Sequence, residues 1–536
     1  MQTNGRNKVL WYAAFPMLIL ALVILQQPVQ AQMTSVGIPC SMIPAYHMMM
    51  QDNMGAGLVL IECGLVQGGK PAADGDQVTG DEPQPPNILV SNRSCTSANS
   101  CTKSESSVWH SAKPGDQTVV VNYNDHNGNN YSGTSYSTDG GATFTEILPP
   151  PLGTGHGTNY GDPIVVYNLK QQKWYAGDLV TGCGGLGVGL WTSPDGQNWT
   201  TGACAHNNSS DDRESFWIDN NPFSTKYGRM YISFNNFNIG SGALEVTYSD
   251  DGTTWSTPAE LANGNPFIRD VQVTGTPPSS PLSHAGYTST VFVAGMDEGG
   301  GGNATRQNIM YRSTDGGVTW TSSIMGPRFN PVGDGLCSSN GYFEQVNPIW
   351  RHMGWGEPGV GIDGVVHYVY AGQGQQPNDH GDIYYVRSTD NGSTWSAPIK
   401  LNDDPGGQYK TQWMPSLSVN YNLASPQQVA KVTVSWYDRR QATSACNNVT
   451  DPGCSYYRYG IQSADNGVTW SANFQVSDQL IPEPAQDDPG VVNCYAGDYD
   501  YATAIGTNAY VTWTDGRVAV GGVQVQNVEY ATIPEP

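Results

Sequence analysis

Charged side chains are scarce in this chain of 536 residues. Only 13% of residues are Asp, Glu, Lys or Arg, and 24 basic residues face 47 acidic ones. So little charge disfavours long charged helices and coiled coils, which need charged residues along their exposed faces. The net charge of −23 disfavours nucleic acid and anionic membrane surfaces as partners, because both would be repelled. Neutral glycans and cations are compatible with this acidity.

Long apolar runs are also missing, except near the N-terminus. Residues 9–25 are uncharged and mostly apolar, Arg6 and Lys8 precede them, and Val29-Gln30-Ala31 offers small residues for a cleavage site. This order predicts a signal peptide over residues 1–31. An uncleaved membrane anchor is the alternative, because the run is at the short end of a spanning helix. We expect a secreted, periplasmic or cell-surface protein with no membrane insertion beyond the signal peptide.

No pair of cysteines has the Cys-x-x-Cys spacing of zinc and redox motifs, although the chain contains ten cysteines. An even number of cysteines in an exported chain predicts disulfides instead. Cys95 with Cys101 and Cys446 with Cys454 are the expected pairs, because each pair is close in sequence within a Gly-, Ser- and Asn-rich stretch. The other pairings are left open.

Glycine, proline and large aromatic residues are abundant, with 64 Gly, 35 Pro, 29 Tyr and 15 Trp. Many turns and many aromatic residues with few charges favour an all-β chain. Residues 32–86 differ from the rest, because methionines crowd around His47 and a Gly-, Asp- and Pro-rich linker follows from residue 68. The Met/His cluster could bind copper through sulfur. We favour the alternative, a flexible apolar patch that packs on the main domain.

One short pattern recurs six times from about residue 87 onward: Ser-x-Asp, then glycine, then an aromatic residue. Its aspartates are Asp139, Asp195, Asp251, Asp315, Asp390 and Asp465. Most copies follow an apolar or alternating run, so each predicts a β-hairpin turn. The Asp carboxylate would accept backbone N–H bonds, and glycine would supply the positive φ. The aromatic residue would begin the next strand and bury its ring.

These segments resemble the Asp-box, or bacterial neuraminidase repeat, of the sialidase superfamily. The resemblance implies a β-propeller of four-stranded antiparallel blades, with each Asp-box between the third and fourth strands. Candidate strands around the six turns, and a seventh unit without an Asp-box, predict an all-β propeller over residues 87–536. Seven blades are favoured and six are the alternative. Residues 87–91 are expected to complete the last blade and so close the ring.

The first strands of six of the seven units begin with an acidic residue, on the face opposite the Asp-boxes. These residues are Glu105, Asp162, Glu214, Asp270, Glu344 and Asp498. Inner strands line the channel of a propeller, so we expect these carboxylates to converge at its mouth. Like charges raise each other's pKa, so such a ring needs cations, arginines or protons. Arg440 and Arg517 are the expected arginines, and Ca²⁺ is the metal that oxygen ligands favour. Alternatively, each acid only caps its own blade.

Sialidases of this family use a Tyr nucleophile activated by Glu, an Asp acid/base, and three arginines that hold the substrate carboxylate. The resemblance implies these candidate catalytic residues: Glu214, Asp162, Asp498 and Tyr499. It implies these candidate substrate-binding residues: Arg440, Arg517, Glu105, Asp270 and Glu344. The Arg-Ile-Pro motif that carries the family's first arginine is absent from this chain.

The sequence therefore predicts an exported propeller that binds or processes a glycan or glycoprotein, with no required cofactor. Three functional classes stay open. A glycoside hydrolase needs two positioned carboxylates, which the acidic ring could supply. A non-catalytic protein-binding or scaffold propeller needs only the rigid ring, and the missing Arg-Ile-Pro motif favours it. A polysaccharide lyase would need a Tyr/His pair, for which His110 is available.

Overall fold

The computed structural model describes residues 32–70, 87–91, 100–127, 130–148, 151–278, 286–333, 335–337, 341–420, 429–520 and 522–536. The predicted signal peptide and Cys95 lie outside these residues. Strands dominate the described part, and the one α-helix in it is α1 (Met54–Glu62). No helix in the described part is long and apolar enough to cross a membrane.

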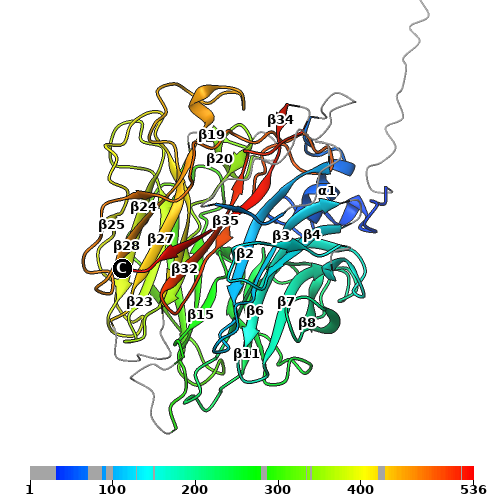
Figure 1. The fold of residues 1–536 in the computed structure, drawn as a ribbon. Helices are drawn as coiled ribbons and strands as arrows, with labels where there is room; N and C mark the ends of the chain where they lie inside the picture. Colours follow the sequence, from blue (N-terminus) through cyan, green and yellow to red (C-terminus); the bar gives the residue numbers. More distant parts are fainter. Residues whose placement is uncertain are drawn as a thin grey trace, which may run out of the picture.

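Seven sheets of four or five strands follow one another through the described part of the chain (Figure 1). The first three sheets comprise β2 (Lys103–His110), β3 (Val119–Asn127), β4 (Asn130–Ser137) and β5 (Thr145–Glu146); β6 (Asn159–Asn168), β7 (Lys173–Val180), β8 (Gly187–Ser193) and β9 (Thr200–His206); and β10 (Asp211–Ile218), β11 (Met230–Asn236), β12 (Ala243–Ser249) and β13 (Ala259–Ala262). The fourth comprises β14 (Ile268–Arg269), β15 (Val273–Gly275), β16 (Val291–Asp297), β17 (Gln307–Ser313) and β18 (Thr321–Ile324).

The fifth and sixth sheets repeat the same antiparallel order. They comprise β22 (Glu357–Val360), β23 (Val366–Gly372), β24 (Asp382–Ser388) and β25 (Ile399–Lys400); and β26 (Gln412–Val419), β27 (Val432–Asp438), β28 (Tyr457–Ser463) and β29 (Phe474–Gln475). The last sheet contains β31 (Thr503–Ile505), β32 (Asn508–Asp515), β35 (Asn527–Pro534) and β1 (Ile88–Leu89). Two small sheets lie outside this series: β19 (Gly335–Leu336), β20 (Glu344–Asn347) and β21 (Trp350–Arg351), and the hairpin of β33 (Ala519–Val520) and β34 (Val523–Gln524).

The two ends of the propeller are joined by strand pairing. β1 pairs antiparallel with β35, with Ile88 opposite Tyr530. β30 (Asp500–Tyr501) pairs in parallel with β2 of the first sheet, with Ser106 opposite Asp500. Both pairings satisfy backbone groups that would otherwise form exposed sheet edges. The predicted all-β propeller of four-stranded antiparallel sheets, closed by an N-terminal strand, is confirmed.

The six Asp turns lie between the third and fourth strands of the first six sheets. In each turn the Ser hydroxyl accepts a glycine N–H, for example Gly252 N–H to Ser249 at 2.8 Å. The Asp carboxylate accepts further backbone N–H groups, as Asp251 does from Thr253 and Thr254 at 2.7 Å each. These bonds satisfy the backbone where the chain leaves the sheet.

The turn glycines also fix the spacing between neighbouring sheets. A Cβ on Gly252 would lie 2.6 Å from the hydroxyl of Tyr175, a residue of the preceding sheet, and one on Gly392 would lie 2.9 Å from the Phe292 ring. Phe144 after the first turn is buried, but the tryptophans after the other five turns are less buried than the sequence pattern predicts. Trp395 and Trp470 are only partly buried, because they bridge to the preceding sheet at its surface. Trp470, for example, packs edge-on against Tyr385 at 4.8 Å.

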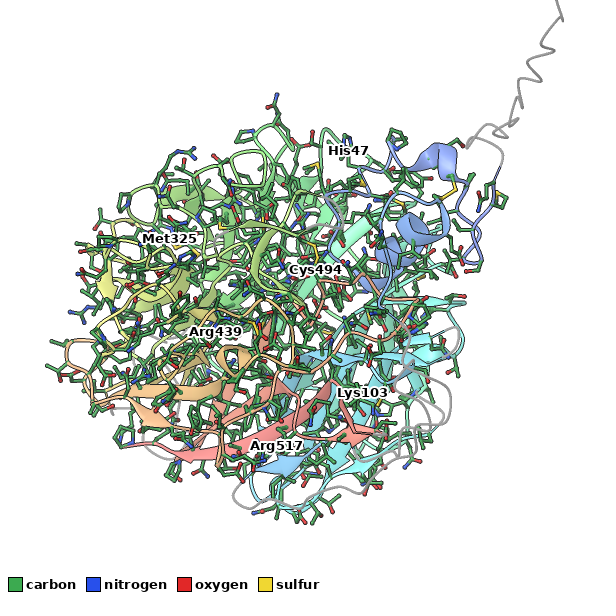
Figure 2. All side chains as sticks on the ribbon, turned by 90° about the horizontal axis from the view of Figure 1, so that it is seen from above. His47, Lys103, Met325, Arg439, Cys494 and Arg517 are labelled. Carbon is green, nitrogen blue, oxygen red and sulfur yellow. A yellow bond between two sulfur atoms is a disulfide. The ribbon has the colours of Figure 1, made fainter. Side chains whose placement is uncertain are left out.

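Residues 32–70 form a small unit that lies at one side of the end of the propeller marked by α1, β19 and β20 in Figure 1. The Cys40–Cys63 disulfide closes this unit. Its side chains Met48, Met54 and Leu60 are buried in one cluster with residues of the second and third sheets. The crowded methionines therefore pack as an apolar patch. Figure 2 looks down on this end, with His47 of the unit labelled.

Four disulfides join described cysteines. They are Cys40–Cys63, Cys183–Cys204, Cys337–Cys494 and Cys446–Cys454. The predicted Cys446–Cys454 pair is confirmed. Cys101 is also disulfide-bonded, and its expected partner lies outside the described residues.

Replacement of Gly252 by Ala tests the role of the turn glycines. Gly252 has a φ of 79°, and a Cβ there would clash with Tyr175. We expect Gly252→Ala to lower the free energy of unfolding by about 2–4 kcal/mol, from backbone strain and overpacking together. Gly506→Ala is the matched control, because Gly506 has a φ of 68° with open space around its Cα. It should cost about 1 kcal/mol. If urea unfolding showed the same loss of stability for both variants, the packing role of Gly252 would be contradicted.

The Asp turns should make the protein sensitive to acid. Hydrogen bonds from Thr469 and then Ser463 lower the pKa of Asp465 to about 2. A carboxyl whose pKa is lower in the folded chain stabilises it above the unfolded pKa, and this stability is lost as pH falls through the folded value. The melting temperature of the wild type should therefore exceed that of Asp465→Asn above about pH 4. The difference should shrink toward pH 2, and a difference independent of pH would disprove this account.

Candidate functional site

A β-bulge interrupts the first strand of several sheets at the same place, on the propeller face opposite the Asp turns. The register shifts after Ser104 in β2, Gly161 in β6, Asp212 in β10 and Trp413 in β26. At each bulge, and at its counterpart in the fourth sheet, one non-glycine residue has a positive φ. These residues are Glu105, Asp162, Arg213, Asp270 and Met414. Strained backbone of this kind clusters at functional sites. We call this end of the channel the mouth.

The bulge corrects the predicted acidic ring in the third sheet. Ser107 pairs with Asn122 in β2–β3, and Ser215 pairs with Ser233 in β10–β11. Counting back from these pairs makes Arg213, not Glu214, the counterpart of Glu105. The prediction that Glu214 shares the position of the other acids is therefore wrong by one residue. Strand side chains alternate between faces, so a one-residue error places the side chain on the wrong side.

The fifth sheet provides a second correction. Glu344 was predicted to begin its first strand, but Glu344 lies in β20 of the separate three-stranded sheet. The first strand of the fifth sheet is β22, which begins at Glu357. The strands β19–β21 are inserted between β18 and β22. The repeat pattern therefore pointed to β20 instead of β22 as the first strand of the fifth sheet. The prediction that six acids lie at equivalent strand positions is therefore also wrong.

The two arginines expected to neutralise the acids bind elsewhere. Arg440 donates to Asp438 and Asp403 at 2.7 Å each. Arg517 donates to Asp478 at 2.7 Å and to Asp515 at 2.8 Å. Each arginine thus anchors local loops around its own sheet, and the structure does not bring either one to Glu105, Asp162 or Asp498.

Three of the predicted acids do meet at the mouth, through backbone contacts and one shared amide. Asp498 N–H donates to Glu105 at 2.8 Å, and Asp162 N–H donates to the Asn124 side chain at 3.0 Å. The Asn124 amide in turn donates to Glu105 at 2.5 Å. Asp270 lies further round the mouth, where it accepts from Tyr368 at 2.8 Å and from Gly356 N–H at 2.9 Å.

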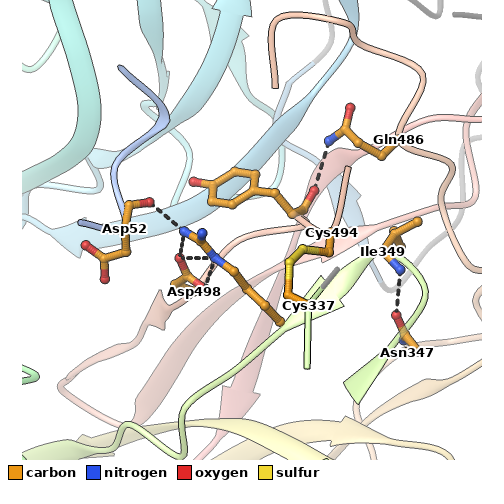
Figure 3. Close-up of a disulfide and its surroundings, with 9 residues drawn as sticks. Asp52, Cys337, Asn347, Ile349, Gln486, Cys494 and Asp498 are labelled. Carbon is orange, nitrogen blue, oxygen red and sulfur yellow. Dashed lines mark hydrogen bonds and ion pairs between the residues drawn. A yellow bond between two sulfur atoms is a disulfide. The ribbon is translucent and has the colours of Figure 1, made fainter. Parts of the chain in front are cut away.

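An unexpected carboxylate, that of Asp52, lies among these residues. It comes from the N-terminal unit, immediately before α1. Its Oδ2 lies 3.5 Å from Arg213 and 3.4 Å from Arg269. Arg351 donates to the Asp52 carbonyl at 2.7 Å and forms an ion pair with Asp498 at 2.7 Å (Figure 3). The mouth therefore contains three arginines around Asp52, a residue from another part of the chain: two lie at its carboxylate and the third binds its backbone carbonyl.

The sequence held a partial signal for these arginines. Arg213 directly precedes Glu214, and Arg269 directly precedes Asp270, at strand starts already singled out for their acids. Arg351 lies in the inserted strand β21, for which the repeat pattern has no counterpart. Asp52 lies outside the repeats altogether, in the methionine-rich segment, so no spacing rule could connect it with the mouth.

Aromatic rings hold the arginines in place. The Arg213 guanidinium lies 4.3 Å from the centre of the Tyr499 ring, and Tyr499 stacks on Tyr501. The Arg351 guanidinium lies 3.9 Å from the centre of the Phe343 ring. Cation–π contacts of this kind stabilise arginines that have been removed from water. Tyr499, a predicted nucleophile, is thus brought to the arginine cluster.

The pKa values of the acids at the mouth shift in opposite directions. Burial would raise the pKa of Asp52, but the charges of Arg269, Arg213 and Arg351 lower it overall. Burial and the neighbouring Asp52 raise the pKa of Asp162 to about 8. Burial and Asp162 likewise raise the pKa of Glu214 well above its usual range. The arginines therefore favour the ionised form of the Asp52 carboxyl, whereas burial favours the neutral form of the Glu214 carboxyl.

The predicted pairing of Glu214 with Tyr499 is not visible in the described structure. Both carboxyl oxygens of Glu214 and the hydroxyl of Tyr499 are buried without a hydrogen-bond partner among the described residues. A neutral carboxyl is also a poor base for activating a phenol. The arginines form ion pairs with Asp52 and, through Arg351, with Asp498. They lower the pKa of Asp52, whereas burial outweighs Arg351 and raises the pKa of Asp498.

Neutralising two buried acids should give opposite results. Asp498→Asn breaks the Arg351 pair and leaves a buried guanidinium short of its partner, so we expect a loss of about 3–5 kcal/mol. Glu214→Gln removes no hydrogen bond of the carboxyl, so stability should stay within about 1 kcal/mol of wild type or increase. Chemical denaturation of both variants measures this difference. If Glu214→Gln unfolded as easily as Asp498→Asn, the assignment of the ionised acid would be wrong.

Comparisons with known proteins give a partial relationship. No family model matches the chain. A curated sialidase from Bacteroides fragilis is 25% identical over 223 residues. This match covers 38% of the chain and 37% of the sialidase, so the chain spans little more than a third of that relative's length. The similarity supports a loose relationship with sialidase-like proteins and identifies no particular motif.

Solved propeller structures resemble the chain only distantly. An α-L-arabinofuranosidase from Fusarium graminearum has a TM-score of 0.39 and 13% identity, with 84% of this chain and 97% of that chain covered. An ulvan lyase has a TM-score of 0.41 and 10% identity, with 88% and 95% covered. A lectin from Aleuria aurantia has a TM-score of 0.36 and 11% identity, with 70% and 94% covered. These scores carry no argument about function.

Proposed function

We propose that this protein is an exported propeller that binds an acidic glycan at the mouth. The sugar carboxylate is received by Arg213 and Arg269, in the position that the Asp52 carboxylate holds, with Arg351 beside them. The observation that carries this proposal is the convergence of three buried arginines on Asp52, a residue from a separate unit of the chain: two lie at its carboxylate and the third binds its backbone carbonyl.

The chemistry of the cluster favours a carboxylate ligand. Guanidinium groups donate planar, paired hydrogen bonds that match a carboxylate. Arg269 carries three nitrogens without a hydrogen-bond partner among the described residues, and its distance of 3.4 Å to Asp52 is that of an ion pair rather than a short hydrogen bond. Asp52 therefore balances the charge of the arginines but leaves several of their N–H groups without an acceptor. A ligand carboxylate that enters more deeply would accept hydrogen bonds from these arginine N–H groups.

Binding without hydrolysis is the function that the site supports best, because burial raises the pKa of Glu214 and favours its neutral form, and no hydrogen bond among the described residues joins Glu214 to Tyr499. Sialidase-like hydrolysis is the second candidate. It is favoured by Tyr499 against Arg213 and by Asp162, whose pKa of about 8 would keep a general acid protonated at neutral pH. Export is supported by the disulfides, which form and persist in oxidising compartments.

Removal of the Asp52 side chain should open the carboxylate position. Asp52→Ala leaves buried guanidinium groups without an anion, so we expect a loss of about 3–5 kcal/mol. Acetate, N-acetylneuraminate or glucuronate should restore part of this stability by filling the position, whereas glucose should not. Melting curves of the full chain at increasing ligand concentration measure the rescue. On a glycan array, Asp52→Ala should bind acidic glycans more strongly than wild type does.

Asp178→Ala is the matched control, because Asp178 is equally buried but has no ion pair among the described residues. Acetate should not rescue it. Equal effects of acetate on both variants would mean that the anion acts nonspecifically, and the carboxylate site would then be rejected. Rescue by acetate with binding of neutral glycans instead of acidic ones would retain the anion site and reject the proposed glycan class.

A further inference from the structure

A second group of carboxylates lies beside the arginine cluster. Asp52 of the N-terminal unit, Asp162 of β6 and Asp212 of β10 each place a carboxylate oxygen within 4.8 Å of the other two. All three side chains are almost completely buried, with at most 2% of their surface exposed. Three elements distant in sequence thus bring three negative oxygens together away from water.

The hydrogen bonds of these carboxylates leave specific oxygens unused. Asp52 directs Oδ2 toward the arginines, and Asp162 uses Oδ2 to accept Arg213 N–H at 3.2 Å. The other oxygen of each, Oδ1, is buried without a hydrogen-bond partner among the described residues. A buried carboxylate oxygen without a donor is costly, so a missing partner is expected at this point.

Asp212 links the N-terminal unit to the same carboxylate cluster through two hydrogen bonds. Its Oδ2 accepts Asp52 N–H at 3.1 Å, and its Oδ1 accepts the Asn53 amide at 2.6 Å. No Lys, Arg or His in the described part of the chain forms an ion pair with Asp162 or Asp212. The arginines of the mouth instead pair with Asp52, Asp270 and Asp498. Neither carboxylate therefore has a directly paired cation among the described residues, although the charges of Arg213 and Arg269 act on Asp162 and Asp212 from a greater distance.

We propose that Ca²⁺ binds between Asp52, Asp162 and Asp212 and fastens the N-terminal unit to the mouth of the propeller. All three ligands are oxygens, which selects a hard cation over zinc or copper. Ca²⁺–oxygen bonds of about 2.3–2.6 Å allow two ligands to lie up to about 5 Å apart, which accommodates oxygens within 4.8 Å of one another. Mg²⁺ requires bonds of about 2.0–2.1 Å in strict octahedral geometry and usually keeps several waters, which three buried carboxylates suit less well.

This site shares Asp52 with the proposed glycan site but does not rest on the glycan function, because its test measures calcium alone. The arginines lie at Oδ2 of Asp52, whereas Oδ1 has no hydrogen-bond partner among the described residues. A bound divalent ion would offset the repulsion among the three acids, which otherwise requires shared protons. It would also explain why the chain directs Asp52 and Asp212 toward each other although both are negative.

The test uses the full chain and the metal alone. Elemental analysis of protein purified with CaCl₂ and then desalted should find one more Ca²⁺ per chain in wild type than in Asp212→Asn. Excess EGTA should lower the melting temperature of wild type by several degrees, and added CaCl₂ should restore it. The same concentration of MgCl₂ should restore much less. In calcium titration, Asp212→Asn should weaken the affinity of this site at least 100-fold.

Asp211→Asn is the matched control. Asp211 is the neighbouring buried aspartate of β10, but it bonds His206 and Asn208 rather than the cluster. This variant should keep the calcium stoichiometry and the EGTA effect of wild type. Asp162→Asn provides a second test should Asp212→Asn fail to fold. Wild type that contains no calcium attributable to Asp212 or Asp162, or whose melting temperature is unchanged by EGTA, would overturn the proposal in favour of shared protons.

Discussion

The ion pairing of Asp52 with buried arginines is the interaction on which the mouth of the propeller depends. Removing charged groups from water costs several kcal/mol per ion, and the mouth buries Arg213, Arg269 and Arg351 together. Without Asp52, the remaining ion pair of Arg269 among the described residues would be the more distant one with Glu298, at 3.8 Å. The N-terminal unit is thus part of the electrostatic balance of the domain, because it supplies the anion that lets the arginines remain buried.

The sheets depend on a different constraint, the close approach between neighbours at the opposite face. Turn glycines such as Gly252 and Gly392 contact aromatic rings of the preceding sheet at distances that no side chain would permit. Because the same turn recurs in six sheets, the same spacing recurs around the ring. A rigid frame of this kind can hold strained bulges at the other face, where Glu105 and Arg213 have positive φ.

The sequence predicted what depends on local, repeated patterns. Short sequence segments, each interpreted by itself, were enough to predict the turns, the strand order, the closing strand at Ile88 and the Cys446–Cys454 pair. The errors have physical causes. A single-residue bulge moved Glu214 out of the ring, and the inserted strands β19–β21 displaced Glu344. Asp52 and Arg351 meet only in three dimensions, so no pattern along the chain could have indicated that they define the site.

The packing of the N-terminal unit limits how a ligand can enter the mouth. Met48, Met54 and Leu60 are buried against the second and third sheets, and burial of each such side chain contributes about 1.5–3 kcal/mol. Hydrogen bonds between a ligand carboxylate and charged donors contribute about 1.5–3 kcal/mol each. The unit also buries Ile38, Ile43, Val59 and Val66 in the same cluster, so a single carboxylate does not displace the whole unit. Exchange at the arginines requires only that Asp52 and the short loop before α1 move, while the Cys40–Cys63 disulfide keeps the rest of the unit docked.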